Sequence, residues 1–128
     1  MMIGYATVGT NDTSKALPFY DAVLGELGAK KAFDSPKGGR LYSRTEGKFE
    51  FSVTPPYDGS PATVGNGSMI ALAADTQEQV RNVYAKAMEL GGTCEGEPGW
   101  RGPEGGFYGA YFRDLDGNKL CVYRMGPA

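Results

Sequence analysis

Residues 11–28 read Asn-Asp-Thr-Ser-Lys-Ala-Leu-Pro-Phe-Tyr-Asp-Ala-Val-Leu-Gly-Glu-Leu-Gly, and this stretch has the signals of an amphipathic helix with both of its ends. Residues 11–14 are side chains that cap helix N-termini, and Gly28 is placed to end the helix. One face carries apolar side chains at helical spacing: Ala16, Tyr20, Val23, Leu24 and Leu27. Residues 3–8 are rich in β-formers and predict a strand that leads into this helix.

The same order of elements returns in the second half of the chain. Residues 68–74 predict a strand, and Thr76 with Gln79 forms a capping-box pattern that opens a second helix. Three pairs of residues lie 64 positions apart in this chain of 128 residues: Tyr5 and Met69, Tyr20 and Tyr84, and Gly28 and Gly92. The spacing indicates an internal repeat, with one plan used in both halves.

Two further strands are expected after each helix. Residues 40–45 and 48–54 predict a pair in the first half, and residues 107–113 and 119–124 predict a pair in the second. The second pair is joined by residues 114–118, Asp-Leu-Asp-Gly-Asn, which have the composition of a tight turn. Each half therefore reads as strand, helix, strand, strand.

The chain is predicted to be one domain, residues 1–128, because neither half is large enough to bury a sheet face alone. Its first module covers about residues 1–54, a Gly- and Pro-rich linker covers 55–67, and the second module covers 68–128. Residues 96–106 are predicted to be another Gly- and Pro-rich loop. The two halves should pack around a shared concave surface, which is a natural ligand site.

Histidine is absent from the sequence, and this absence excludes whole reaction classes. Without an imidazole there is no Ser-His or Cys-His nucleophile pair, no His general base and no zinc or iron site built on His ligands. The apolar fraction of 41% and the charged fraction of 22% are those of a soluble globular domain.

The net charge and the cysteine content limit the classes of binding partner and the cellular location that the sequence predicts. The net charge is −2 and no basic run occurs, so neither nucleic acid nor a membrane surface is an expected partner. Cys94 and Cys121 are the only cysteines and do not form a C-x-x-C pair. Together with a start that lacks the features of a signal peptide, this favours a reducing, cytoplasmic location.

The chain resembles the vicinal oxygen chelate superfamily, which includes glyoxalase I, bleomycin-resistance proteins and extradiol dioxygenases. The similar stretches are residues 16–28, residues 65–74 (Gly-Asn-Gly-Ser-Met-Ile-Ala-Leu-Ala-Ala), residues 98–101 (Pro-Gly-Trp-Arg) and residues 111–118 (Tyr-Phe-Arg-Asp-Leu-Asp-Gly-Asn). The resemblance implies an α+β fold in which two βαβββ modules pair into a half-open eight-stranded barrel. It also implies a homodimer as the common assembly.

The resemblance further implies where metal-using members hold a divalent ion, on His and Glu side chains of the first and last strands of the modules. Here Tyr5 stands at the first-strand His, Met69 at the His of the second module, and Cys121 at the last-strand Glu. Phenol, thioether and thiol mix hard and soft donors and suit no common hydrolytic or oxygenase metal. The sequence therefore predicts a lost metal site and no cofactor.

Glu50 is the one carboxylate left at a corresponding position. Aligning residues 47–50 with residues 118–121 makes Glu50 the first-module counterpart of Cys121. If Glu50 points into an apolar cavity, the pKa of its carboxyl is raised and suits a general acid or base. If it points outward, it is an ordinary surface charge.

Trp100 and Arg101 lie in the second predicted loop, close in sequence to Tyr108 and Tyr111. One interpretation is a mobile lid that offers an aromatic and a cationic contact to an anionic or planar ligand. The other is that Trp100 anchors the loop to the core while Arg101 makes a surface ion pair. Cys121 has no His partner and is not expected to act as a nucleophile.

The function we predict from these residues is binding of a small organic molecule inside the barrel, without a metal. Tyr5, Glu50 and Arg101 would supply polar contacts, and the wall would consist of Met69, Trp100, Tyr108, Tyr111 and Cys121. A first alternative is a glyoxalase-like lyase or isomerase in which Glu50 shuttles a proton. A second alternative is a non-catalytic dimerisation module with a filled barrel.

Overall fold

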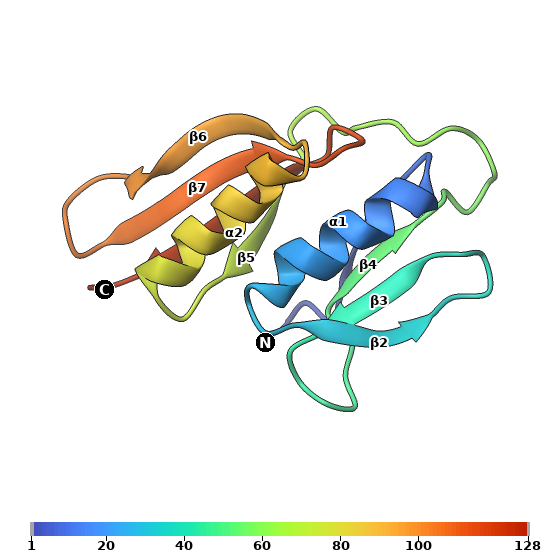
Figure 1. Ribbon diagram of the computed structural model, residues 1–128, viewed down its shortest axis with the longest axis horizontal. Helices are drawn as coiled ribbons and strands as arrows, with labels where there is room; N and C mark the ends of the chain where they lie inside the picture. Colours follow the sequence, from blue (N-terminus) through green and yellow to red (C-terminus); the bar gives the residue numbers. More distant parts are fainter. Residues whose placement is uncertain (1, 128) are drawn as a thin grey trace.

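The computed structural model describes residues 2–127 and contains two modules with the same order of elements (Figure 1). The first module comprises β1 (Ala6–Gly9), α1 (Thr13–Gly25), β2 (Lys30–Asp34), β3 (Arg40–Ser43) and β4 (Phe51–Thr54). The second comprises β5 (Ile70–Ala73), α2 (Gln77–Glu89), β6 (Thr93–Trp100), β7 (Phe107–Arg113) and β8 (Lys119–Met125). Each module is therefore a βαβββ unit.

Each module forms its own four-stranded sheet, in the orders β1-β4-β3-β2 and β5-β8-β7-β6. The first strand of each module runs parallel to the last one, and the remaining neighbours are antiparallel. The predicted α+β fold of two βαβββ modules is confirmed. In the described part of the chain, the eight strands form two separate sheets and do not close into a barrel.

Both helices begin where the sequence predicted a cap. The Asp12 side chain accepts a hydrogen bond from the Ser14 amide at 3.1 Å, and the Thr76 hydroxyl accepts one from the Gln79 amide at 3.1 Å. The Gln79 side chain reaches back to the amide of Asp75 at 2.7 Å, one residue before the usual capping-box partner. Among the described residues, neither helix is long and apolar enough to cross a membrane.

Two strands lie where the sequence did not predict them. β2 reads Lys-Lys-Ala-Phe-Asp and is exposed throughout, so it lacks the alternation that indicates a strand and depends on pairing with β3. The predicted loop at residues 96–106 is wrong over residues 96–100, which belong to β6. Gly and Pro are tolerated there because β6 is an edge strand whose register shifts between Cys94 and Gly99.

The hydrophobic core lies between each sheet and its helix. In β7 the alternate side chains Tyr108, Ala110 and Phe112 are buried in this core. α1 and α2 also contact each other, which joins the two halves into one core (Figure 1). Each sheet has its own helix on one face, and we call the opposite face its open face. A ligand that contacts strand side chains must reach them from the open faces.

A buried polar network also joins the two modules. The Tyr20 hydroxyl of α1 donates to Asp114 Oδ2, and both side chains are buried. Asp114 Oδ1 accepts from the backbone amides of Asp116 and Asn118, each at 2.9 Å. The side-chain Nδ2 of Asn118 donates to Asp114 Oδ2 and to the Gly9 carbonyl of β1, each at 2.9 Å. The predicted turn at residues 114–118 therefore also fixes the second module to the first.

Replacing Tyr20 by Phe is expected to lower the free energy of unfolding by about 1–3 kcal/mol, because a buried carboxylate oxygen loses one of its donors. The measurement is urea denaturation followed by circular dichroism. Tyr57→Phe is the matched control, since the Tyr57 side chain is 89% exposed, and it should change stability by less than about 0.5 kcal/mol. Equal effects of the two substitutions would show that the Tyr20–Asp114 contact does not hold the modules together.

Candidate functional site

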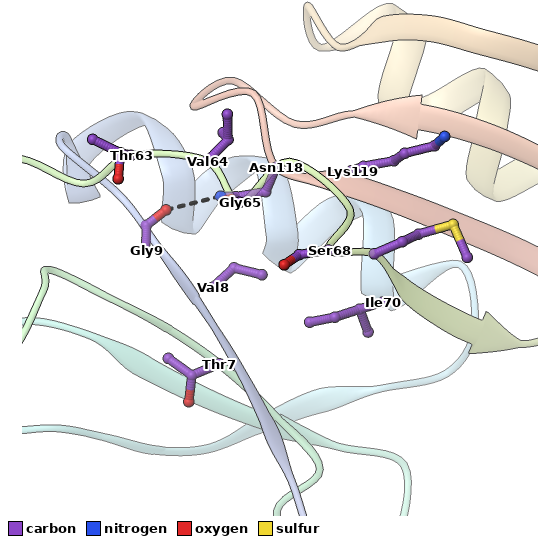
Figure 2. Close-up of a pocket in the computed structure, with 11 residues that line it drawn as sticks. Thr7, Val8, Gly9, Thr63, Val64, Gly65, Ser68, Ile70, Asn118 and Lys119 are labelled. Atoms are coloured by element: carbon purple, nitrogen blue, oxygen red, sulfur yellow. Dashed lines mark hydrogen bonds between the residues drawn. The ribbon is translucent and has the colours of Figure 1, made fainter.

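A cavity of about 240 Å³ lies where the two modules meet, between β1 and the start of β5. Its lining comes from β1, from the segment that connects the modules and from the start of β8, and includes Thr7, Val8, Val64, Ser68, Met69 and Lys119. In Figure 2 the hydrogen bond from Asn118 to the Gly9 carbonyl crosses one end of the cavity. The lining contains one cation, Lys119, and no carboxylate, so it suits a neutral or an anionic organic group.

The open face of the second sheet adjoins this cavity at Lys119. Figure 2 shows the Lys119 side chain extending away from Val8 of β1, and its ammonium lies 5.6 Å from the centroid of the Tyr111 ring. Tyr111 of β7 pairs with Cys121 of β8 on this face. Farther along, the rings of Phe107 and Tyr123 stack with centroids 5.2 Å apart. Lys119 thus belongs both to the cavity lining and to the surroundings of the Tyr111 ring.

Arg101 follows β6 directly and folds back over the same open face. Its guanidinium carbon lies 5.4 Å from the centroid of the Tyr111 ring. Nη2 donates to the Glu97 carbonyl at 2.6 Å. The surface ion pair of the second interpretation is not formed with any of residues 2–127. Arg101, Tyr111 and Cys121 are therefore three predicted site residues that the structure places together.

Cys121 is fully buried, with 0% of its surface exposed, although it belongs to the open face. Burial raises the pKa of its thiol above the ordinary value, an effect that the neighbouring Tyr111 and the charges of Arg101 and Lys119 only partly offset. Burial and the Cys121 thiol also raise the pKa of Tyr111. Both groups are consequently neutral near pH 7, and Cys121 is a poor nucleophile.

Tyr5 and Glu50 lie one residue before β1 and β4 of the first sheet, because these strands begin later than predicted, at Ala6 and Phe51. The Tyr5 ring meets the Phe49 ring edge-on, with centroids 5.0 Å apart. Glu50 Oε1 accepts hydrogen bonds from the Ser43 hydroxyl at 2.9 Å and from the Arg44 amide at 3.1 Å. Neither residue is part of the cavity lining, and the Glu50 carboxylate is engaged with its own sheet.

Trp100 and Tyr108 lie on the helix side of the second sheet, opposite to Tyr111. Their rings meet edge-on with centroids 5.3 Å apart, and Trp100 packs against the core to which Tyr108 belongs. Trp100 thus anchors the end of β6 to the core. Of the residues predicted for the site, only Met69 lines the cavity itself.

Comparison with known proteins agrees with this architecture. The family model described as Glyoxalase/Bleomycin resistance protein/Dioxygenase superfamily matches residues 2–122. The chain belongs to this superfamily. A glyoxalase/bleomycin resistance protein from Albidiferax ferrireducens T118 is 38% identical, with a TM-score of 0.83 over 97% of this chain and 98% of that one.

More distant superfamily structures share the fold. A glyoxalase/bleomycin resistance protein/dioxygenase family enzyme from Burkholderia phytofirmans PsJN is 19% identical, with a TM-score of 0.70 over 95% of this chain and 97% of that one. A lactoylglutathione lyase from Agrobacterium tumefaciens is 20% identical, with a TM-score of 0.65 over 95% of this chain and 92% of that one. No sequence among curated proteins matches significantly.

In this superfamily member, sequence reasoning missed two parts of the site. Lys119, Phe107 and Tyr123 share the open face with Tyr111, and the alternation within residues 107–113 and 119–124 could have placed them there. The contribution of residues 63–65 to the cavity carries no such signal, because the connecting segment has no periodicity. Among residues 2–127, no group of three His, Cys, Asp or Glu side chains is placed to hold a metal ion.

The two cysteines are expected to react very differently with Ellman's reagent. Cys94 is exposed and should react quickly in the folded protein, whereas buried Cys121 should react only after unfolding in guanidinium. The measurement is the number of thiols released before and after denaturant is added, with Cys94→Ser as the control that abolishes the fast reaction. Fast modification of the Cys94→Ser protein would contradict the buried, neutral state of Cys121.

Proposed function

We propose that this superfamily member binds a small organic molecule at the cavity between its modules and on the adjoining open face of the second sheet. The observation that carries the proposal is that Lys119 both lines the cavity and lies beside Tyr111, which pairs with Cys121. Ligand sites are typically concave and mostly apolar, with a few polar groups that orient the ligand. A cavity lined by Thr7, Ser68 and Met69, with Lys119 leading from it to an aromatic face, meets this description.

We infer that binding does not use the superfamily's divalent metal. The donor set at the corresponding positions is the phenol of Tyr5, the thioether of Met69 and the thiol of Cys121, which together suit no common catalytic ion. Tyr5 is engaged with the Phe49 ring, and Cys121 is buried as a neutral thiol. These residues do not fit a hard divalent cation, and no step of the proposed function depends on one.

Binding is better supported than a lyase or isomerase reaction. The proton-shuttle alternative needs a free carboxylate at the ligand, whereas Glu50 Oε1 accepts bonds from Ser43 and Arg44. Without a metal, the developing negative charge of an enediolate would also need several kcal/mol of stabilisation from side-chain donors. A purely structural dimerisation module is less well supported because a cavity is present between the modules.

We also propose a homodimer that covers the open face of the first sheet. This face carries an aromatic cluster of Tyr5, Phe33 and Phe49, which are 53%, 47% and 41% exposed. The Phe33 and Phe49 rings meet edge-on at 5.8 Å. Contiguous exposed apolar side chains of this kind mark protein interfaces.

Ligand binding is expected to occur without metal. Titration of ¹⁵N-labelled protein with a fragment library of small aromatic compounds, in the presence of EDTA, should shift the amides of Met69, Tyr111, Lys119 and Cys121. Tyr111→Ala should weaken binding by about tenfold because ring stacking is lost, whereas Tyr57→Ala should not. Shifts confined to other surfaces would overturn the proposed site.

A second measurement tests metal binding through the melting temperature of the Cys94→Ser protein. This substitution removes the exposed thiol, which could otherwise bind metal adventitiously. Zn²⁺ or Ni²⁺ should leave the melting temperature unchanged. A rise of several degrees that EDTA reverses would show linkage of a bound metal to the folded state and contradict the metal-free proposal.

The wild-type protein should sediment as a dimer in analytical ultracentrifugation, and Phe49→Glu should sediment as a monomer because a charge would be buried in the interface. Tyr57→Glu, a change at an exposed side chain of the connecting segment, should leave the dimer intact. A monomeric wild type, or a dimeric Phe49→Glu protein that is correctly folded by circular dichroism, would exclude this interface.

A further inference from the structure

We propose that the ligand is an organic acid whose carboxylate or phosphonate group binds beside the ring of Tyr111, which Arg101 and Lys119 both approach. This inference rests on the proposed function, since it names the class of molecule that the open face of the second sheet accepts. Four observations carry it: the placement of Arg101, the unpaired charge of both cations, the neutral groups around them and the aromatic surface next to them.

The Arg101 guanidinium lies close to β6 at two glycines, which leave room for it. A Cβ atom at Gly96 would lie 3.0 Å from Arg101 Nη2 and 3.2 Å from Tyr111 Cδ2, and one at Gly99 would lie 3.2 Å from Arg101 Nη1. The Glu97 carbonyl accepts a bond from Nη2 and fixes the orientation of the guanidinium. A guanidinium has five N–H donors, so most of them stay available to a ligand. Gly96, Gly99 and the Glu97 carbonyl thus together determine the position of the Arg101 guanidinium.

The two cations face the same ring, and neither has an acidic partner. Within residues 2–127, Arg101 and Lys119 make no ion pair, whereas Arg113 of the same sheet pairs with Glu95 at 2.6 Å. Both lie within 5.6 Å of the Tyr111 centroid. Both positive charges therefore act on the surface around the Tyr111 ring, and an anion bound there is attracted by each of them.

The groups around the two cations do not neutralise them. Burial raises the pKa of both Tyr111 and Cys121, so the phenol and the thiol carry no negative charge near pH 7. The adjoining cavity also contains no carboxylate. A ligand oxyanion therefore meets a guanidinium and an ammonium that form no ion pair within residues 2–127, a setting in which charge-assisted hydrogen bonds are strong.

The organic part of the acid has an apolar surface beside the cations. Gly109 of β7 lies between Tyr111 and Phe107, and a Cβ there would approach Phe107 Cε1 to 2.6 Å, so the Phe107 ring covers this glycine. The stacked Phe107–Tyr123 pair then continues the aromatic surface from Tyr111. An acid with an aromatic or other flat apolar body matches this combination better than a bare inorganic anion.

The test is a set of calorimetric and NMR titrations with benzoate, phenylphosphonate, neutral benzamide and inorganic phosphate at constant ionic strength. We expect benzoate or phenylphosphonate to bind at least about tenfold more tightly than benzamide, with shifts at Tyr111 and Cys121. The stronger of the two acids identifies the head group. Inorganic phosphate should bind more weakly than phenylphosphonate, because it lacks the apolar body.

Single substitutions distinguish binding by Arg101 and Lys119 from attraction by the overall charge of the protein. Arg101→Gln and Lys119→Gln should each weaken acid binding by about tenfold while leaving benzamide unchanged. Gly96→Ala should also weaken it, because the added Cβ displaces the flexible end of Arg101 and crowds the Tyr111 ring. An amide spectrum that is unchanged outside β6 and the neighbourhood of Tyr111 would show that the protein is folded. Lys15→Gln, which removes an exposed cation of α1, is the matched control and should have no effect.

The outcomes distinguish this inference from the proposed function. Equal binding of benzoate and benzamide at Tyr111 would overturn the organic-acid inference and leave the proposed binding site intact. Equal loss in Lys15→Gln and Lys119→Gln would also overturn it, since general charge would then account for binding. If neither these probes nor the fragment library binds at this face, both proposals fail.

Discussion

The buried contact between Tyr20 and Asp114 is the constraint on which the arrangement of the two modules depends. It links α1 of the first module to the β7–β8 turn of the second, across 94 positions of sequence. The same carboxylate organises its own turn, and Asn118 carries the connection onward to the Gly9 carbonyl of β1. Because buried polar groups are costly when unpaired, this network accepts few alternative arrangements of the modules. It therefore also fixes the walls of the cavity, which β1 and β8 share.

The covering of each sheet by a single helix explains where a ligand can bind. The helix sides are filled by the common core, so strand side chains that alternate away from the core are left on the open faces. The two open faces then differ in chemistry. The first carries the exposed aromatic cluster of Tyr5, Phe33 and Phe49, and the second carries Arg101, Lys119 and Tyr111 beside the cavity. This difference is why we assign the first face to a partner subunit and the second to a ligand.

Particular residues show how far the sequence could predict the site. Tyr111 and Cys121 were both expected in the wall of the site, and the structure pairs them across β7 and β8, because strands with strong alternation have a fixed facing. Trp100 was expected in a loop and lies in β6, packed against the core, because an edge strand tolerates Gly and Pro that would indicate a loop elsewhere. Lys119 was not expected at the site at all. The alternation within β8 could have placed Lys119 on the open face, but the approach of its ammonium to the Tyr111 ring has no sequence signal, because it depends on the direction of a long flexible side chain.

The sequence by itself determined the repeat, the two capped helices and the turn at residues 114–118, because these follow from local spacing and from short-range hydrogen bonds. It also determined that any chemistry here proceeds without histidine. Only the tertiary structure decided that β2 and β6 are strands, that Glu50 is held by Ser43 and Arg44, and that Arg101 lies over Tyr111. These features arise from contacts between segments distant in sequence or from the exact room left by glycines. Such contacts are set by packing, whereas local propensity acts only along the chain.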